Sequence, residues 1–268
     1  MAIYVRFRAD GLEEEAWGLV EGGEVRVVKG SPFTDVAPTR KVLPLSNIRE
    51  YLPPADPPNI IAIGVNYPAH MRESRSAFEA PSAPLLFFKA TTALTAHERP
   101  ILLPREAPEE VDYEAELVAA IGRKARHVPR DRALEYVAGY TCGNDVSARD
   151  CQLRLDRQWA RGKSFDTFAP VGPWLVTDLD PSDLAVRARV NGRLLQDGRT
   201  RDMTFDVPAL VSFLSRQMTL LPGTLIFTGT PGGVGFARTP PFFLRAGDVC
   251  EIEIEGVGTL RNPVLREA

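Results

Sequence analysis

Apolar and polar positions alternate in short runs along the first 30 residues, a pattern typical of half-buried β-strands. Three such runs cover residues 3–7, 15–20 and 25–28, and a glycine pair at 22–23 supplies a turn between the last two. The pattern therefore predicts a β-hairpin or meander at the start of the chain.

A proline-rich stretch over residues 52–59 follows this β unit. A compositional break of this kind is typical of a domain boundary. We therefore expect a small N-terminal β domain over residues 1–52 and a main domain over residues 53–268.

The main domain shows apolar runs that are bounded by glycine, proline or polar residues. Such runs predict buried strands, and an Asn-Gly pair between two of them predicts a tight hairpin turn. Short helices are expected near Asn66, over residues 131–137 and over residues 206–214. The strands outnumber the helices, so we predict a β-rich α+β fold with mixed sheets. The predicted strands and the hairpin turn include Ile60–Val65, Leu85–Lys89, Val186–Val190, Asn191-Gly192 and Thr224–Phe227.

The segment Val111–Gly122 alternates with the period of a strand. Glu114 and Glu116 then point to the same side, and neighbouring carboxylates repel unless a positive charge lies between them. A hard divalent cation would supply that charge. The alternative is that both line the wet face of an edge strand, and the strand alone favours this alternative. Asp112 precedes them, and we expect it near the rim of the strand as a supporting acid.

A second acidic alternation near the C-terminus serves as an internal comparison. Glu251, Glu253 and Glu255 lie on one face of a predicted strand, and we interpret them as facing solvent.

His70 and Glu73 lie three residues apart in the short helix expected after Asn66. A carboxylate next to an imidazole raises its pKa and selects its tautomer, as a general base requires. The alternative is a solvated pair on a surface loop. Residues 74–84 predict a mobile loop that could serve as a lid.

Three further stretches carry candidate chemistry. Asp145 ends a predicted strand, and Arg149 and Gln152 could be presented beside it by a short helix. Lys163 lies in a Gly-Lys-Ser loop that lacks the glycine spacing of a phosphate-binding loop. Lys89 closes an apolar strand, where it either reaches solvent or faces a site.

A glycine-rich loop, residues 228–235, follows the strand that begins at Thr224. Its backbone N–H groups could hold an anionic group, or the glycines could simply permit a tight turn.

Composition narrows the classes of function. The net charge of −3 over 268 residues gives no electrostatic case for nucleic acid or an anionic membrane. No apolar run approaches the roughly 20 residues of a membrane span, and the N-terminus lacks the layout of a signal peptide. Three sparse cysteines indicate reduced thiols and a cytoplasmic location. Only five of the 32 basic residues are lysine, so each lysine is more informative than usual.

Taken together and in order, several stretches resemble the fumarylacetoacetate hydrolase family over about residues 60–262. They are Ile63-Gly-Val-Asn-Tyr with His70 and Glu73, Asp112-Tyr-Glu-Ala-Glu-Leu, Gly139-Tyr-Thr with Asn144-Asp-Val-Ser-Ala-Arg-Asp and Gln152, Gly162-Lys-Ser-Phe-Asp-Thr-Phe with Pro170 and Gly172-Pro-Trp, and Thr228-Gly-Thr-Pro-Gly-Gly-Val-Gly. The resemblance implies a mixed-sheet β-roll and a homodimer.

The resemblance also implies roles for individual residues. Glu114, Glu116 and Asp145 would be metal ligands, and three carboxylates suit Mg²⁺, with Mn²⁺ or Ca²⁺ as alternatives. The implied roles of the other residues are proton transfer or water activation by His70 with Glu73, stabilisation of an enolate or oxyanion by Lys163, and substrate binding by Arg149, Gln152, Thr228, Gly229 and Thr230. Lys89 is followed by an unusual Ala90-Thr-Thr-Ala, and its role stays open.

The chemistry implied by the family is enolate formation from a small-molecule 2-oxo acid. We expect a 2-hydroxyhepta-2,4-diene-1,7-dioate isomerase of aromatic compound degradation, which could also carry the related decarboxylase activity. The alternatives are an acylpyruvate or fumarylpyruvate-type C–C hydrolase, an oxaloacetate decarboxylase, and a non-enzymatic metal- or ligand-binding β module.

Overall fold

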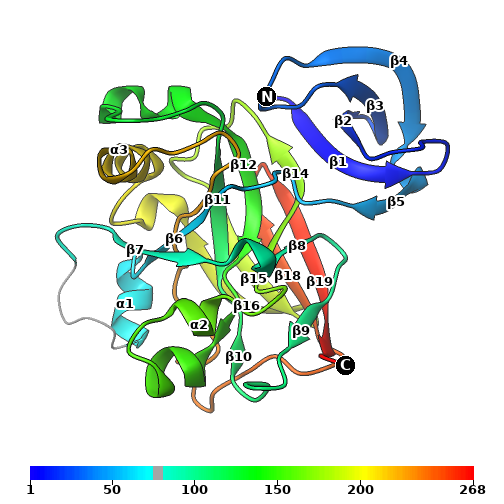
Figure 1. Cartoon of the computed structure of the whole chain (residues 1–268). Helices are drawn as coiled ribbons and strands as arrows, with labels where there is room; N and C mark the ends of the chain where they lie inside the picture. The colour runs from blue at the N-terminus through cyan, green and yellow to red at the C-terminus, as the bar shows by residue number, and fades with distance from the viewer. Residues whose placement is uncertain (75–80) are drawn as a thin grey trace.

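The structure, a computed structural model, describes residues 1–74 and 81–268. Most of the loop predicted as a lid falls on residues 75–80, outside the described residues. The predicted β-rich α+β fold is confirmed: strands form most of the body, and the helices are few and short (Figure 1).

A large mixed sheet runs through the molecule in the order β4-β3-β2-β1-β14-β12-β11-β17-β6-β7, with β5 beside β1 and β8 beside β14. Its strands are β1 (Ile3–Ala9), β2 (Ala16–Glu21), β3 (Glu24–Lys29), β4 (Ala37–Pro44), β5 (Ile48–Tyr51), β6 (Ile60–Gly64), β7 (Leu85–Lys89), β8 (Leu94–Ala96), β11 (Ala115–Ile121), β12 (Val137–Asn144), β14 (Ala169–Val176) and β17 (Leu225–Phe227).

A second sheet has the order β16-β15-β18-β19-β9, and β10 forms a two-stranded pair with β13. These strands are β9 (Ile101–Leu103), β10 (Val111–Asp112), β13 (Ser147–Ala148), β15 (Ala185–Val190), β16 (Arg193–Arg199), β18 (Val249–Ile254) and β19 (Gly258–Arg266). Most of the buried apolar side chains form one continuous core, and a smaller core lies within β1–β5.

The helices are α1 (Pro68–Ser74), α2 (Ala160–Lys163) and α3 (Val207–Gln217), with the short helical turns η1 (Leu45–Asn47), η2 (Thr91–Ala93), η3 (Arg130–Tyr136), η4 (Cys151–Leu155) and η5 (Thr200–Asp202). Asp206 caps α3 by accepting a hydrogen bond from the Ala209 N–H, and Pro208 occupies its first turn. None of the helices in the described part of the chain is long and apolar enough to cross a lipid bilayer.

The N-terminal strands behave as predicted, with Gly22 and Gly23 at positive φ in the turn between β2 and β3. In Figure 1 they form a unit beside the main body, on the side away from α1 and α2. Strand β1 also pairs with β14, so the large sheet continues from this unit into the main body. The domain division at residue 52 stays a prediction.

Two expectations about single elements are wrong. The segment Val111–Gly122 is not one strand: it pairs first with β13 and then with β12 and β17, and the chain changes partner between Asp112 and Ala115. Lys163 does not lie in a loop but ends the short helix α2.

The wet-edge alternative is also wrong, because β11 is paired on both sides and all its residues are buried. Asp112 is likewise fully buried, not near a rim. The comparison strand differs: in β18 buried Cys250, Ile252 and Ile254 alternate with partly buried Glu251 and Glu253.

Candidate active site

Three buried carboxylates meet where β10, β11 and β12 come together. Glu114 lies at the break between β10 and β11, Glu116 lies in β11, and Asp145 directly follows β12. The Asn144 side chain secures the break by accepting a hydrogen bond from the Glu114 N–H at 2.9 Å. One ligand oxygen from each of the three acids lies within 4.8 Å of the others.

Two lysines face the carboxylates. The Lys163 Nζ lies 2.8 Å from Glu114 Oε2 and 2.7 Å from Asp145 Oδ2. The Lys89 ammonium contacts the other Asp145 oxygen and the Val146 carbonyl. Lys89 therefore faces the site, as one of the two sequence alternatives predicted, and burial lowers its pKa despite the neighbouring Asp145.

The pKa values of Glu114 and Glu116 are shifted in opposite directions. Burial opposes ionisation of Glu114, but Lys163 and then Arg149 outweigh it and hold the pKa of Glu114 well below its usual value. For Glu116, burial raises the pKa well above its usual value, and the neighbouring Asp145 and Glu114 add to this effect. The ion pairs among the described residues of this site reach Glu114 and Asp145 but not Glu116. A further positive charge next to Glu116 would relieve that imbalance.

The residues present fit a hard divalent cation. Oxygen-to-metal bonds of about 2.0–2.6 Å allow one ion to reach three carboxylate oxygens that lie this close together. An all-carboxylate donor set without imidazole or thiolate suits Mg²⁺, Mn²⁺ or Ca²⁺.

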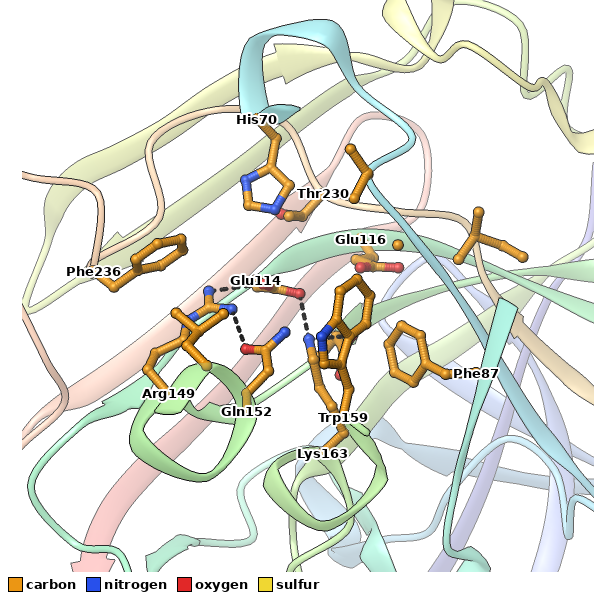
Figure 2. A pocket seen from close by; sticks show the side chains of 15 residues that line it. His70, Phe87, Glu114, Glu116, Arg149, Gln152, Trp159, Lys163, Thr230 and Phe236 are labelled. Atoms are coloured by element: carbon orange, nitrogen blue, oxygen red, sulfur yellow. Dashed lines mark hydrogen bonds and ion pairs between the residues drawn. The ribbon is translucent and has the colours of Figure 1, made fainter. Parts of the chain in front are cut away.

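Arg149 and Gln152 lie side by side at the margin of the carboxylates (Figure 2). The Arg149 Nη1 donates to Gln152 Oε1 at 2.8 Å. The Arg149 Nη2 lies 2.7 Å from Glu114 Oε1 and 2.8 Å from Asp112 Oδ2. Arg149 is therefore occupied mainly by protein acids, and Gln152 is better placed to contact a substrate.

His70 projects from α1 toward the carboxylates (Figure 2). Its Nδ1 lies 3.1 Å from Glu73 Oε1, so the predicted pair forms. Glu73 is itself held by the N–H of Gly233, at 2.9 Å and 2.8 Å from its two oxygens. The pair is thus anchored to the glycine-rich loop, and the solvated-loop alternative does not describe it.

Several N–H groups of the glycine-rich loop donate to the protein's own acids. Gly229 donates to Glu116 Oε2 at 2.7 Å, and Gly233 and Gly235 donate to Glu73 and Asp112. The Thr228 hydroxyl is buried and donates to the Leu117 carbonyl. Thr230 does line the cavity, but its hydroxyl already bonds to the Ala115 carbonyl. Of the three residues predicted to bind substrate here, Thr230 lines the cavity, and the substrate contact stays a prediction for all three.

Aromatic side chains complete a small cavity of about 20 Å³ above the carboxylates. Phe87 and Trp159 stack edge to face with ring centroids 5.6 Å apart, and Phe236 lies against the Arg149 guanidinium at 4.4 Å. None of the three is predicted as a site residue by the sequence. The period-2 alternation of β7 would have revealed Phe87, because it shares a face with Lys89.

Asn66 is a further site residue that the sequence analysis missed. Its side-chain amide donates to the Thr228 carbonyl at 2.7 Å and to the Phe205 carbonyl at 2.9 Å. It thereby joins the start of α1 to the glycine-rich loop. The preceding Val65 has a φ of 57°, a strained value for a β-branched residue, and it lines the cavity. Strain of this kind persists where the surroundings hold it, and it is common at functional sites.

The chain matches the family described as "Fumarylacetoacetate (FAA) hydrolase C-terminal" over residues 59–265 and the one described as "Rv2993c-like, N-terminal" over residues 4–54. The chain belongs to the fumarylacetoacetate hydrolase family, and it is an enzyme of that family with the corresponding β-rich fold.

Individual relatives refine this placement. An "Oxaloacetate tautomerase fahd2, mitochondrial" of Xenopus laevis is 44% identical over 84% of this chain and 70% of its own length. "Protein Rv2993c" of Mycobacterium tuberculosis is 44% identical over 90% of this chain and 88% of its own length. A solved structure of a 2-hydroxyhepta-2,4-diene-1,7-dioate isomerase from Mycobacterium marinum is 40% identical, with a TM-score of 0.88 and full coverage of both chains.

Proposed function

We propose that this enzyme moves a proton between oxygen and carbon to interconvert the enol and oxo forms of a short 2-oxo dicarboxylate. The first candidate substrate is 2-hydroxyhepta-2,4-diene-1,7-dioate, in aromatic compound degradation. The observation that carries the proposal is the position of His70: a carboxylate-held imidazole directly above three carboxylates that can share one hard cation.

Glu114, Glu116 and Asp145 would hold Mg²⁺, or Mn²⁺ or Ca²⁺ in its place. When bound, such an ion supplies Lewis acidity to a 2-oxo carboxylate and lowers the energy of its enolate form. Side chains of this chain would carry out the proton transfer and hold the substrate.

The Glu73 carboxylate lies on Nδ1 of His70, which favours the proton at that nitrogen and leaves Nε2 as the base. For the dienedioate, which is a dienol, His70 would take the proton of the 2-hydroxyl group, and return of a proton to C5 gives the 2-oxo-3-ene isomer. For oxaloacetate, His70 would take a proton from C3, beside the carbonyl, and its return to the carbonyl oxygen gives the enol. Lys163 and the Gln152 amide, which both line the cavity, would donate to the oxygen on which negative charge develops.

The second candidate is the keto–enol tautomerisation of oxaloacetate. It is supported by relatives with that name, such as the one from Xenopus laevis. It needs the same proton transfer on a smaller substrate. Decarboxylation and C–C hydrolysis would release an enolate of the same kind as the C–C bond breaks, so they are the lower-ranked candidates for the same site.

Assays of the purified protein with Mg²⁺ test the proposal. Ultraviolet absorbance can follow isomerisation of the dienedioate, loss of enol oxaloacetate and cleavage of an acylpyruvate in parallel. We expect metal-dependent acceleration of the first or the second reaction, and its loss in His70→Asn. Metal-dependent cleavage of the acylpyruvate with neither proton-transfer reaction accelerated would overturn the proposal.

We also propose that the enzyme works in the cytoplasm as a homodimer. The reduced, sparse cysteines support the location, since all three are free and buried. Light scattering on the purified protein tests the dimer, and a monomeric mass at assay concentration would contradict it.

A further inference from the structure

Asp112 is a fully buried acid that lies outside the set of candidate metal ligands. Its Oδ1 accepts hydrogen bonds from the N–H groups of Tyr113 at 2.9 Å and Gly235 at 2.8 Å. Its Oδ2 accepts from the Phe236 N–H at 3.0 Å and from Arg149 Nε at 2.9 Å. Two different segments, the glycine-rich loop and the strand end that carries Arg149, therefore converge on one carboxylate.

Arg149 connects Asp112 to the candidate metal ligand Glu114. Its guanidinium is fixed on three sides: by Asp112, by Glu114 Oε1 at 2.7 Å and by the Phe236 ring. Phe236 is held in turn by the same Asp112 carboxylate. A planar guanidinium bound in this way has one orientation.

That orientation determines which way the Gln152 amide points. Arg149 Nη1 has only protons to offer, so it selects the carbonyl oxygen of Gln152 as its partner, at 2.8 Å. The NH₂ group of Gln152 must then face the other way, toward the cavity, as Figure 2 shows.

We propose that Asp112 is a positioning residue for this site. Through Arg149 it holds Glu114 in place and turns Gln152 so that an amide donor faces the oxygens of the substrate. The inference rests on the proposed function, since it assumes an anionic 2-oxo acid in the cavity.

The substitution Asp112→Asn distinguishes this role from simple filling of space. The new side chain would have the same size, but one of the two acceptor oxygens would become an NH₂ group facing N–H donors. Arg149 would lose one of its two charged partners, and its guanidinium would no longer fix the orientation of Gln152 as tightly. Outer partners of this kind typically change affinity or activity by about 10- to 100-fold when they are removed.

The test measures binding of oxalate, a planar mimic of an enolised 2-oxo acid, to the Mg²⁺-loaded protein by calorimetry. We expect Asp112→Asn to weaken oxalate binding by about 10- to 100-fold. In a Gln152→Leu background the same substitution should cost clearly less, because the amide that it orients is already gone. Equal loss in both backgrounds, or unchanged oxalate binding in Asp112→Asn, would overturn the proposal.

Two controls separate positioning from folding and from the proposed function. Val25→Ala removes buried volume from the separate core of β1–β5, so it lowers stability without touching the cavity, and it should bind oxalate normally. If the wild type with Mg²⁺ does not bind oxalate, the proposed function fails. If the wild type binds it and Asp112→Asn binds it equally well, only the role of Asp112 fails.

Discussion

The ammonium group of Lys163 lies 2.7 Å from a carboxylate oxygen of Asp145, with both side chains buried beneath the cavity. Lys163 and Asp145, 18 positions apart in the sequence, thus form a buried ion pair, and Lys163 also contacts Glu114. Removing one member of such a pair leaves an uncompensated buried charge, which typically costs about 3–5 kcal/mol.

The first prediction concerns that lysine. Lys163→Met should destabilise the metal-free protein by roughly that amount, and it should lower kcat/KM by at least about 100-fold because a donor to the developing oxyanion is lost. Urea unfolding and steady-state kinetics measure the two effects. Lys124→Met, at an exposed lysine, is the matched control and should change neither. Normal turnover in Lys163→Met would exclude the assigned role.

The second prediction concerns the metal. Glu116→Gln keeps an acceptor for the Gly229 N–H and removes a buried charge that Asp145 and Glu114 repel, so the metal-free protein should become more stable. Mg²⁺ at 100 times its Kd should stabilise the wild type by about 2.7 kcal/mol and the variant hardly at all.

Thermal unfolding with and without Mg²⁺ measures this difference. Glu253→Gln, in the partly exposed strand β18, is the control and should keep the response to Mg²⁺. Full stabilisation of Glu116→Gln by Mg²⁺ would show that Glu114, Glu116 and Asp145 (the carboxylate trio) are not the metal site.

The third prediction concerns the His70–Glu73 pair. Glu73→Gln should lower kcat by about 100-fold or more, because the imidazole loses the anion that fixes its tautomer and orientation. Stabilisation by Mg²⁺ should stay unchanged, since neither residue belongs to the carboxylate trio. Arg72→Ala, on the same helix with an exposed side chain, is the control. A parallel loss of the Mg²⁺ response would indicate that the variant disturbs the site as a whole.

The fourth prediction concerns alkaline pH. Burial raises the pKa of the Cys142 and Cys250 thiols to about 12, from an ordinary value of 9.0. Between about pH 9 and pH 12 the unfolded chain therefore loses these protons while the folded chain keeps them. Stability must fall as the pH rises through this window, by up to about 1.4 kcal/mol per pH unit for each thiol.

Urea unfolding at pH 8 and pH 10.5 measures that slope. Cys250→Ala should reduce it by about one thiol's share, and thiol reagents should modify Cys142 and Cys250 in the wild type only after unfolding. A slope that Cys250→Ala leaves unchanged would contradict the assignment.

The sequence alone determined much of the local structure and the list of candidate residues. The alternating runs of the N-terminal unit, the Asn191-Gly192 turn with both residues at positive φ, and the proline in the first turn of α3 depend on neighbouring residues only. Short-range rules of periodicity and turn chemistry therefore suffice for them. Collinear motifs also bring the carboxylates, His70 and Lys163 into one hypothesis.

Only the tertiary structure determines whether those residues are buried and which groups they contact. Whether Glu114 and Glu116 face solvent or a site depends on which strands flank β11, and both flanking strands come from later in the chain. Asp112 and Glu73 meet the glycine-rich loop from more than 120 residues away. Such contacts leave no local pattern, because a hydrogen bond between distant segments requires only that each place a donor or an acceptor at the same point in space.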